Sequence, residues 1–349
     1  MSRPDRDKKP KPARAVIFGC AGLTLAGAER RLFAEADPLG FILFKRNLRK
    51  PEQARALVAS LRAAVGRADA PVLIDQEGGR VARLGRPYWR VAPAAARFGA
   101  LARIDRFVAA EAAALNSRLI AHELHDLGID VDCLPVLDVP AAGANAVIGD
   151  RAYAADVELV AMLGRAACGG LLAGGVLPVI KHIPGHGRAR ADSHHALPVV
   201  ETPLAELDRT DFAPFRALAD MPMAMTAHVV YAAVDAERPA TISAAVIGEV
   251  IRARIGFSGL LLSDDIGMAA LSGALALRAR AALAAGCDVV LHCSGDLEEM
   301  RQVAGACASM SEAAQARWAR AAALRRTPQP FDSARARAHV DELLKGVPA

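Results

Sequence analysis

The sequence predicts an α/β protein, a single-domain (β/α)8 barrel of the TIM type. Short apolar runs rich in β-branched residues alternate with longer segments of helical periodicity, and eight such pairs can be traced along the 349 residues,. Runs such as 260–262 are continuously apolar, as expected of strands covered on both faces,. Neither glycine-rich phosphate-binding signature of open doubly wound sheets occurs, so a closed barrel fits better,.

The strands and helices are assigned from these patterns. Strands are expected at residues 15–19, 40–44, 72–75, 129–136, 176–182, 223–229, 260–264 and 288–292,. Helices are expected at about 26–36, 52–66, 107–127, 156–172, 203–219, 244–254, 269–285 and 296–324, the last of which can be broken,. Thr202 and Pro203 provide a helix start, because an N-cap residue precedes a proline at the first helical position,.

The two ends of the chain are expected to lie outside the barrel. Residues 1–14 form a basic tail with six cations and two anions, and the prolines among these charges favour disorder,. The barrel domain then occupies residues 15–349 and ends in a helix at about 332–345, on the outside or at the bottom of the barrel. Because the tail holds +4 of the formal net charge of +5, the remainder gives no strong electrostatic reason to bind nucleic acid,.

The composition is typical of a cytoplasmic protein without stable membrane insertion. No apolar run reaches the ~18 residues of a membrane span,. The run at 15–18 after the basic tail is too short for a signal peptide,. The six cysteines are scattered without a Cys-x-x-Cys pair, which indicates buried free thiols in a reducing compartment,. Electrostatic tethering of the tail to an anionic membrane is an alternative that salt-dependent sedimentation would test.

Ionisable residues end five of the eight predicted strands. They are Asp75 on the third strand, Lys181 and His182 on the fifth, His228 on the sixth, Asp264 and Asp265 on the seventh and His292 on the eighth. The carboxyl ends of barrel strands form one face, and this face carries catalysis in the architecture. Solvation of a strand end explains each residue singly, but packing does not require all five strands to end in this way. We therefore expect the functional site at this face.

The pair Asp264 and Asp265 supplies a carboxylate to this face. Side chains of adjacent residues on an extended strand point in different directions, so at most one of the two faces the centre of the site. That carboxylate can act as nucleophile, base or metal ligand. The other would brace a loop or cap the next helix. Strand alternation alone does not say which is which.

The loop after the fifth strand is the second chemical feature. Four of the nine histidines of the chain fall between residues 182 and 195. Asp192 and His194 share a face of extended backbone, so the carboxylate can hydrogen-bond one ring nitrogen and fix the tautomer of the histidine,. A neighbouring carboxylate also raises the pKa of a histidine, which suits a general acid near neutral pH.

The same loop also contains residue types that could support metal or Schiff-base chemistry. Pro184 and Gly185 prevent His182 and His186 from sharing a helix face, and residues 122–125 do not form the His-Glu-x-x-His zinc signature,. We therefore expect no metal. A Schiff base on Lys181, as in barrel aldolases, is a further alternative. A simpler role for Lys181 and His182 is to donate hydrogen bonds to a hydroxylated ligand.

Several segments together resemble the β-N-acetylglucosaminidases of glycoside hydrolase family 3. Residues 181–187 (KHIPGHG) and 192–194 (DSH) resemble the loop that separates these enzymes from the β-glucosidases of the family, with Ile183 where phenylalanine is usual. Residues 250–254 and 259–264 match the active-site signature and its spacing, and 74–83, 148–152 and 225–229 look like three further segments. The resemblance covers about residues 15–325. We expect no second domain of the kind that the β-glucosidases usually carry.

The resemblance implies a retaining exo-hydrolase that removes terminal β-linked N-acetylglucosamine from carbohydrate substrates. In bacterial cytoplasm these are muropeptides that contain anhydro-N-acetylmuramic acid, released during peptidoglycan recycling. By the family pattern, Asp264 takes the nucleophile position and His194 the general acid/base position, with Asp192 as its partner. The sugar-binding positions of the family fall on Asp75, Arg83, Arg151, Lys181 and His182. We expect a monomer that needs no cofactor.

One deviation from the usual chemistry leaves alternatives open. Retaining glycosidases ordinarily use two carboxylates ~5 Å apart, whereas a histidine would replace the second one here. Because a histidine does not repel phosphate as a carboxylate does, a glycoside phosphorylase is the first alternative, and product analysis in phosphate buffer separates the two. A sugar-binding barrel without catalysis is the second, and any turnover would exclude it.

Overall fold

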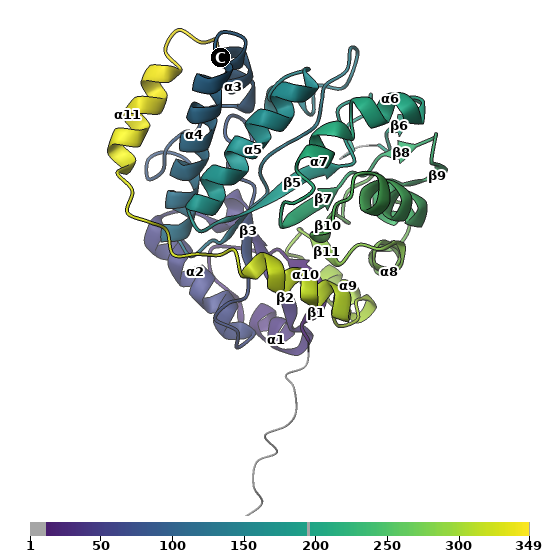
Figure 1. Cartoon of the computed structure of the whole chain (residues 1–349). Coiled ribbons are helices and arrows are strands. Elements are labelled where there is room, and N and C mark those ends of the chain that lie inside the picture. The colour runs from purple at the N-terminus through teal and green to yellow at the C-terminus, as the bar shows by residue number, and fades with distance from the viewer. Residues whose placement is uncertain (1–11, 194–195, 349) are drawn as a thin grey trace, which may run out of the picture.

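The structure, a computed structural model, describes residues 12–193 and 196–348. Eight parallel strands close into a barrel in the order β1-β11-β10-β7-β5-β4-β3-β2, and helices surround it (Figure 1). The predicted single-domain (β/α)8 barrel is thus confirmed. No helix in the described part of the chain is both long and apolar enough to cross a membrane.

Each barrel strand coincides with one of the eight predicted runs. The strands are β1 (Arg14–Phe18), β2 (Pro38–Leu43), β3 (Val72–Ile74), β4 (Val131–Asp132), β5 (Leu177–Ile183), β7 (Met223–Thr226), β10 (Leu260–Asp265) and β11 (Val289–His292). Arg14, which we assigned to the tail, instead begins β1, and its guanidinium donates to the carbonyl oxygens of Ala36 and Ala304 at 3.0 and 2.9 Å. The rest of the predicted tail up to residue 11 lies outside the described residues.

The helices follow the prediction with five differences, one of which is that the segment expected as a helix at 244–254 is a π-helix. They are α1 (Gly27–Ala36), α2 (Pro51–Ala64), α3 (Ala95–Ala102), α4 (Arg106–Asp126), α5 (Val157–Ala173), α6 (Leu204–Arg209), α7 (Ala213–Ala217), the π-helix η4 (Val246–Arg254), α8 (Leu275–Ala285), α9 (Leu297–Ala306), α10 (Glu312–Ala322) and α11 (Ser333–Leu343), with short 3-10 turns η1 (Lys45–Asn47), η2 (Gly149–Arg151) and η3 (Ala240–Ile242). Segment 203–219 is split into α6 and α7, segment 296–324 into α9 and α10, α8 begins later than expected, and α3 was not predicted.

Both interrupted helices have a local cause. Between α6 and α7, Pro214 has no backbone N–H to donate to the carbonyl four residues earlier, so a new helix begins with this proline in its first turn,. Between α9 and α10 the chain passes under the barrel, where the Ala308 carbonyl accepts from the N–H of Ala15 at 2.9 Å. As a result α10 lies at the amino ends of the strands, opposite the face predicted to be functional.

The core is divided by the barrel wall. Leu260 and Leu262 of β10 belong to the cluster inside the barrel, while Leu261 packs with the surrounding helices in a separate cluster. This alternation is what a closed sheet requires, since successive side chains point to opposite faces. The last helix, α11, packs on the outside against α4 (Figure 1).

A small second sheet, which the sequence did not predict, lies after the loop that follows β5. It consists of β6 (Val199–Val200), β8 (Val230–Tyr231) and β9 (Asp235–Pro239), with β6 parallel and β9 antiparallel to β8. The hydroxyl of Tyr231 donates to the Gly185 carbonyl. The segment that follows β7 therefore contacts the loop after β5 near its start, through Tyr231, and at its end, through the pairing of β8 with β6.

Candidate active site

A cavity of about 460 Å³ opens at the carboxyl ends of the barrel strands, and we call it the barrel-mouth cavity. Its lining residues are Ile42, Phe44, Asp75, Glu77, Arg80, Val81, Arg83, Val147, Ile148, Arg151, Lys181, His182, His186, Asp192, Ser193, Met225, Asp264, Asp265, Met268, Leu291 and Cys293. All the residues that the family pattern assigns to the site are among them except His194, which lies outside the described residues. Of the ionisable residues predicted at strand ends, His228 and His292 do not line the cavity. Residues far apart in sequence thus meet at the predicted face.

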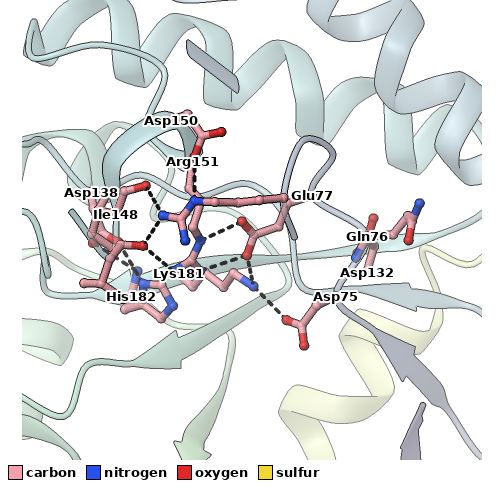
Figure 2. Close-up of polar contacts among 12 residues, drawn as sticks. Asp75, Gln76, Glu77, Asp132, Asp138, Ile148, Asp150, Arg151, Lys181 and His182 are labelled. Carbon is pink, nitrogen blue, oxygen red and sulfur yellow. Dashed lines mark hydrogen bonds and ion pairs between the residues drawn. The ribbon is translucent and has the colours of Figure 1, made fainter. Parts of the chain in front are cut away.

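Lys181 is the centre of a buried ion-pair network that lines one side of the cavity (Figure 2). Its Nζ lies 2.8 Å from Asp75 Oδ1 and 2.7 Å from Glu77 Oε1. Arg83 Nη2 lies 3.0 Å from Asp75 Oδ2, and Arg151 Nε lies 2.8 Å from Glu77 Oε2. Three cations and two carboxylates therefore alternate along one connected surface, which offers both donors and acceptors to a polar ligand.

The network fixes the protonation state of its members. Burial disfavours the ammonium, but the carboxylates of Asp75 and Glu77 outweigh this effect and raise the pKa of Lys181. Burial likewise disfavours both carboxylates, yet the adjacent cations hold the pKa of Asp75 and of Glu77 below the usual range. A lysine must be neutral to attack a carbonyl, so this environment argues against the Schiff-base alternative.

The turn after β3 brings Asp75, Glu77 and Arg83 to the cavity. The side-chain carbonyl of Gln76 accepts from the N–H groups of Arg83 and Leu84 at 2.8 and 3.0 Å, which folds the segment back on itself. Gly78 has a φ of 100°, and a Cβ there would lie 2.3 Å from the Pro93 carbonyl oxygen. The turn therefore requires glycine at this position.

His182 is oriented by a carboxylate that we did not predict. Asp138 is fully buried, and its Oδ2 lies 2.7 Å from His182 Nδ1. Asp138 Oδ1 also accepts from the N–H groups of His182 and His186 at 3.2 and 2.6 Å. Burial disfavours the charge of Asp138, but the His182 ring, the His186 ring and these hydrogen bonds lower the pKa of the carboxyl to about 2. Bonding at Nδ1 leaves Nε2 of His182 available for a ligand.

Asp264, near the end of β10, presents an ionised carboxylate to the cavity. Its Oδ1 accepts from the N–H of Asp265 at 2.8 Å. Burial opposes ionisation, but the rings of His228 and His182, this hydrogen bond and the Lys181 ammonium outweigh it and lower the pKa of Asp264. A carboxylate held in this state can act as a nucleophile or as a base.

Asp265 has different partners, as strand alternation predicts. Its Oδ1 accepts from the N–H groups of Gly267 and Cys293 at 2.9 and 3.2 Å, and His292 Nδ1 lies 3.8 Å away. Burial raises the pKa of Asp265 despite these contacts. Its carboxylate therefore braces the loops that follow β10 and β11, as expected for one aspartate of the pair, although both aspartates line the cavity. The choice of Asp264 as the nucleophile stays a prediction.

The loop after β5 returns to the cavity through Asp192 and Ser193. His186 Nε2 lies 3.2 Å from Ser193 Oγ, so positions 186 and 193 of this loop are in contact. Burial lowers the pKa of His186 to about 4, which keeps the ring neutral at neutral pH. The predicted pairing of Asp192 with His194 involves a residue outside the described ranges and stays a prediction.

Two buried residues at the site, Glu77 and Asp138, were not singled out by the sequence analysis, and His186 was considered there only as a metal ligand. Glu77 lies in the segment 74–83 that carried the resemblance, two residues after Asp75. Asp138 follows the predicted fourth strand by two residues. A search for ionisable residues that extended two positions past each predicted strand would have included it.

Among the described residues, no group of three or more His, Cys, Asp or Glu side chains is placed to hold a metal ion.

Comparison with known proteins agrees with this geometry. The family model described as the glycosyl hydrolase family 3 N terminal domain matches residues 25–324. The β-hexosaminidase of Alkalilimnicola ehrlichii is 42% identical over 286 residues, which cover 80% of each chain. That of Bordetella pertussis is 39% identical over 305 residues, which cover 86% of this chain and 85% of the relative. The structure of NagZ from Neisseria gonorrhoeae in complex with N-trifluoroacetyl-D-glucosamine superposes with a TM-score of 0.86 at 34% identity and covers 96% of this chain and 99% of that one. The chain is therefore a glycoside hydrolase of the β-hexosaminidase type and belongs to glycosyl hydrolase family 3.

Proposed function

We propose that this enzyme is a retaining exo-β-N-acetylglucosaminidase that works through a covalent glycosyl-enzyme intermediate on Asp264. The observation that carries the proposal is the ionised carboxylate of Asp264 in the same cavity as the buried network around Lys181. A carboxylate at the carboxyl end of a barrel strand is well placed to attack a sugar that the network holds.

In the first step, an oxygen of Asp264 attacks the anomeric carbon while the bond from that carbon to the aglycone oxygen breaks. The imidazolium of His194 donates its proton to the departing oxygen. In the second step, the neutral imidazole takes a proton from water, the water oxygen attacks the same carbon, and the ester bond to Asp264 breaks. Two inversions give net retention.

The protonation states of the cavity carboxyls support a histidine in the acid/base role. Asp75 and Glu77 are held as anions by their cationic partners, so neither has a proton to donate at neutral pH. Asp265 directs its carboxylate oxygen to two backbone N–H groups. The family pattern assigns the acid to His194, which follows two residues after Asp192, a residue that lines the cavity.

We assign substrate binding to Asp75, Arg83, Arg151, Lys181 and His182. Their alternating charges can pair with successive hydroxyl groups of a pyranose and with the acetamido group. For the natural substrate we propose muropeptides that carry N-acetylglucosamine on anhydro-N-acetylmuramic acid, cleaved in the cytoplasm by a monomer. The six cysteines, all free in the structure, support a reducing compartment,.

Trapping of the intermediate tests the proposal. The enzyme would be incubated with a 5-fluoro N-acetylglucosaminyl fluoride, which forms the intermediate and hydrolyses slowly, and the labelled peptide would then be identified by mass spectrometry. We expect the label on Asp264. A label on Asp265 would keep the mechanism and change the nucleophile. Hydrolysis of an aryl β-N-acetylglucosaminide without any label would contradict the covalent mechanism.

A further inference from the structure

The loop between β5 and β6 is closed by a contact between two buried side chains. His186 and Ser193 are both only 4% exposed, and His186 Nε2 lies 3.2 Å from Ser193 Oγ. Six residues lie between them in sequence, so the contact closes this part of the loop on itself. Both side chains line the barrel-mouth cavity.

The first half of the loop is a fixed support for this contact. The N–H of His186 donates to Asp138 Oδ1 at 2.6 Å, and the carbonyls of Gly187 and Ala189 accept from Ala141 and Asn145 at 3.0 and 2.8 Å. Asp138 is fully buried, so this anchor is shielded from water,. The main chain at His186 is thereby held from the barrel side, independently of Ser193.

Ser193 is held from a second direction as well. Its carbonyl oxygen accepts from the N–H of Ala270 at 3.2 Å, and Ala270 belongs to the segment that follows β10. The strand β10 carries Asp264. Ser193 therefore connects the loop after β5 with the segment after β10. The next residue in the chain is His194.

We propose that His186 and Ser193 form a latch that positions the general acid/base at residue 194 relative to Asp264. This inference rests on the proposed function, in which His194 protonates the leaving group. His186 and Ser193 are positioning residues: they set the reach of the acid without transferring the proton. Because a misplacement of about 1 Å can cost ~10²-fold in rate, a single hydroxyl is sufficient to control this step.

The latch predicts an effect that depends on the leaving group. The test uses aryl β-N-acetylglucosaminides of similar size whose phenols differ in acidity, from 2,4-dinitrophenyl to 4-methoxyphenyl. The value of kcat/KM reports steps up to cleavage of the glycosidic bond, and only the poor leaving group needs a proton there. Ser193→Ala and His186→Leu should lower kcat/KM at least ~10-fold for 4-methoxyphenyl and less than ~3-fold for 2,4-dinitrophenyl glycosides.

Three further variants make the test specific. Ser193→Thr keeps the hydroxyl and should recover most of the loss. The double variant of Ser193 and His186 should lose no more than either single one, because both remove the same contact. Ser60→Ala removes a hydroxyl that donates to the Ala56 carbonyl on α2, and it should match the wild type with both substrates.

His194→Ala separates failure of the latch from failure of the proposed function. If His194→Ala shows the leaving-group dependence and Ser193→Ala does not, the latch is wrong and the acid/base assignment stands. An equal loss of Ser193→Ala on both glycosides would show that the hydroxyl serves substrate binding or folding instead, and would also overturn the latch. If His194→Ala itself shows no dependence on the leaving group, the proposed function fails first. Activity of each variant on the dinitrophenyl glycoside confirms that it is folded.

Discussion

Asp138 Oδ2 lies 2.7 Å from His182 Nδ1, and the second oxygen of the same carboxylate accepts from the backbone N–H groups of His182 in β5 and of His186 in the loop after β5. One fully buried carboxylate thus orients a predicted sugar-binding histidine and anchors the loop that leads to the predicted acid/base. The position of the sugar-binding histidine relative to the predicted acid/base therefore depends on Asp138, a residue that we do not expect to touch the substrate.

The first prediction concerns this carboxylate. Asp138→Asn removes the charge that strengthens three hydrogen bonds, and hydrogen bonds to charged groups contribute about 1.5–3 kcal/mol. Because both His182 and His186 lose their anchor, kcat/KM should fall about 10-fold or more for good and poor leaving groups alike. Asp130→Asn is the matched control, since Asp130 is an ion-paired aspartate at the amino end of β4, bonded to Arg62 and Arg325. Equal effects of the two substitutions on kcat/KM would contradict the prediction.

The second prediction distinguishes the two aspartates at the end of β10. Asp264→Ala should lower kcat on an aryl β-N-acetylglucosaminide at least ~10³-fold, because it removes the proposed nucleophile. Asp265→Asn should stay within about 10-fold of the wild type, since an amide oxygen can still accept from the N–H groups of Gly267 and Cys293,. Added azide should restore turnover of Asp264→Ala and give the α-glycosyl azide. Recovery of the β-product, or a larger loss for Asp265→Asn, would reject the assignment of Asp264.

The sequence predicted the parts of this molecule that depend on periodicity and on strand ends. The eight strands were predictable because β-branched runs alternate with helical segments, and the cavity residues were predictable because the strands of a parallel barrel end at one face. The ion pair between Lys181 and Glu77 was not predictable from the sequence, because it requires the turn at Gly78 to fold back toward β5. A contact of this kind depends on backbone geometry that one sequence does not reveal.

The errors in the secondary structure have similar causes. Strands of two residues, such as β6 and β8, are too short to show a periodic pattern,. The late start of α8 follows from the segment before it, where Asp265 accepts from Gly267 and Gly273 adopts a φ of 86°. Helical periodicity continued through this segment in the sequence, but tertiary contacts of the cavity determined its conformation.

The third prediction concerns stability against pH and follows from His186. Burial lowers the pKa of His186 to about 4, so between pH ~6.5 and ~4 the unfolded chain binds a proton that the folded chain does not,. Folding stability is therefore lost as the pH falls through this interval, by about 3 kcal/mol from this ring. Urea unfolding at several pH values should show a smaller loss for His186→Asn than for the wild type. Ser193→Ala removes the contact but keeps the titrating ring, so it should show the wild-type pH dependence.

The fourth prediction tests the support of the loop after β5 by steric means. A Cβ on Gly187 would lie 2.0 Å from the Val139 carbonyl oxygen, and the three nearest atoms all belong to the backbone of Val139, so no flexible side chain can move aside. Gly187→Ala should therefore lower the free energy of unfolding by about 1–3 kcal/mol. It should also lower kcat/KM on glycosides with poor leaving groups, because the segment that anchors His186 must move.

Gly169→Ala is the matched control for this substitution. Gly169 lies within α5, and a Cβ there meets nothing within 4 Å. Because alanine is favoured over glycine in a helix by about 0.5–1 kcal/mol, this variant should be more stable than the wild type and equally active. An added methyl group should thus lower the free energy of unfolding at position 187 and raise it at position 169 if residues 187 and 139 are in tight contact. Full stability and activity of Gly187→Ala would show that the loop can shift without cost, and the support of His186 from this side would then be rejected.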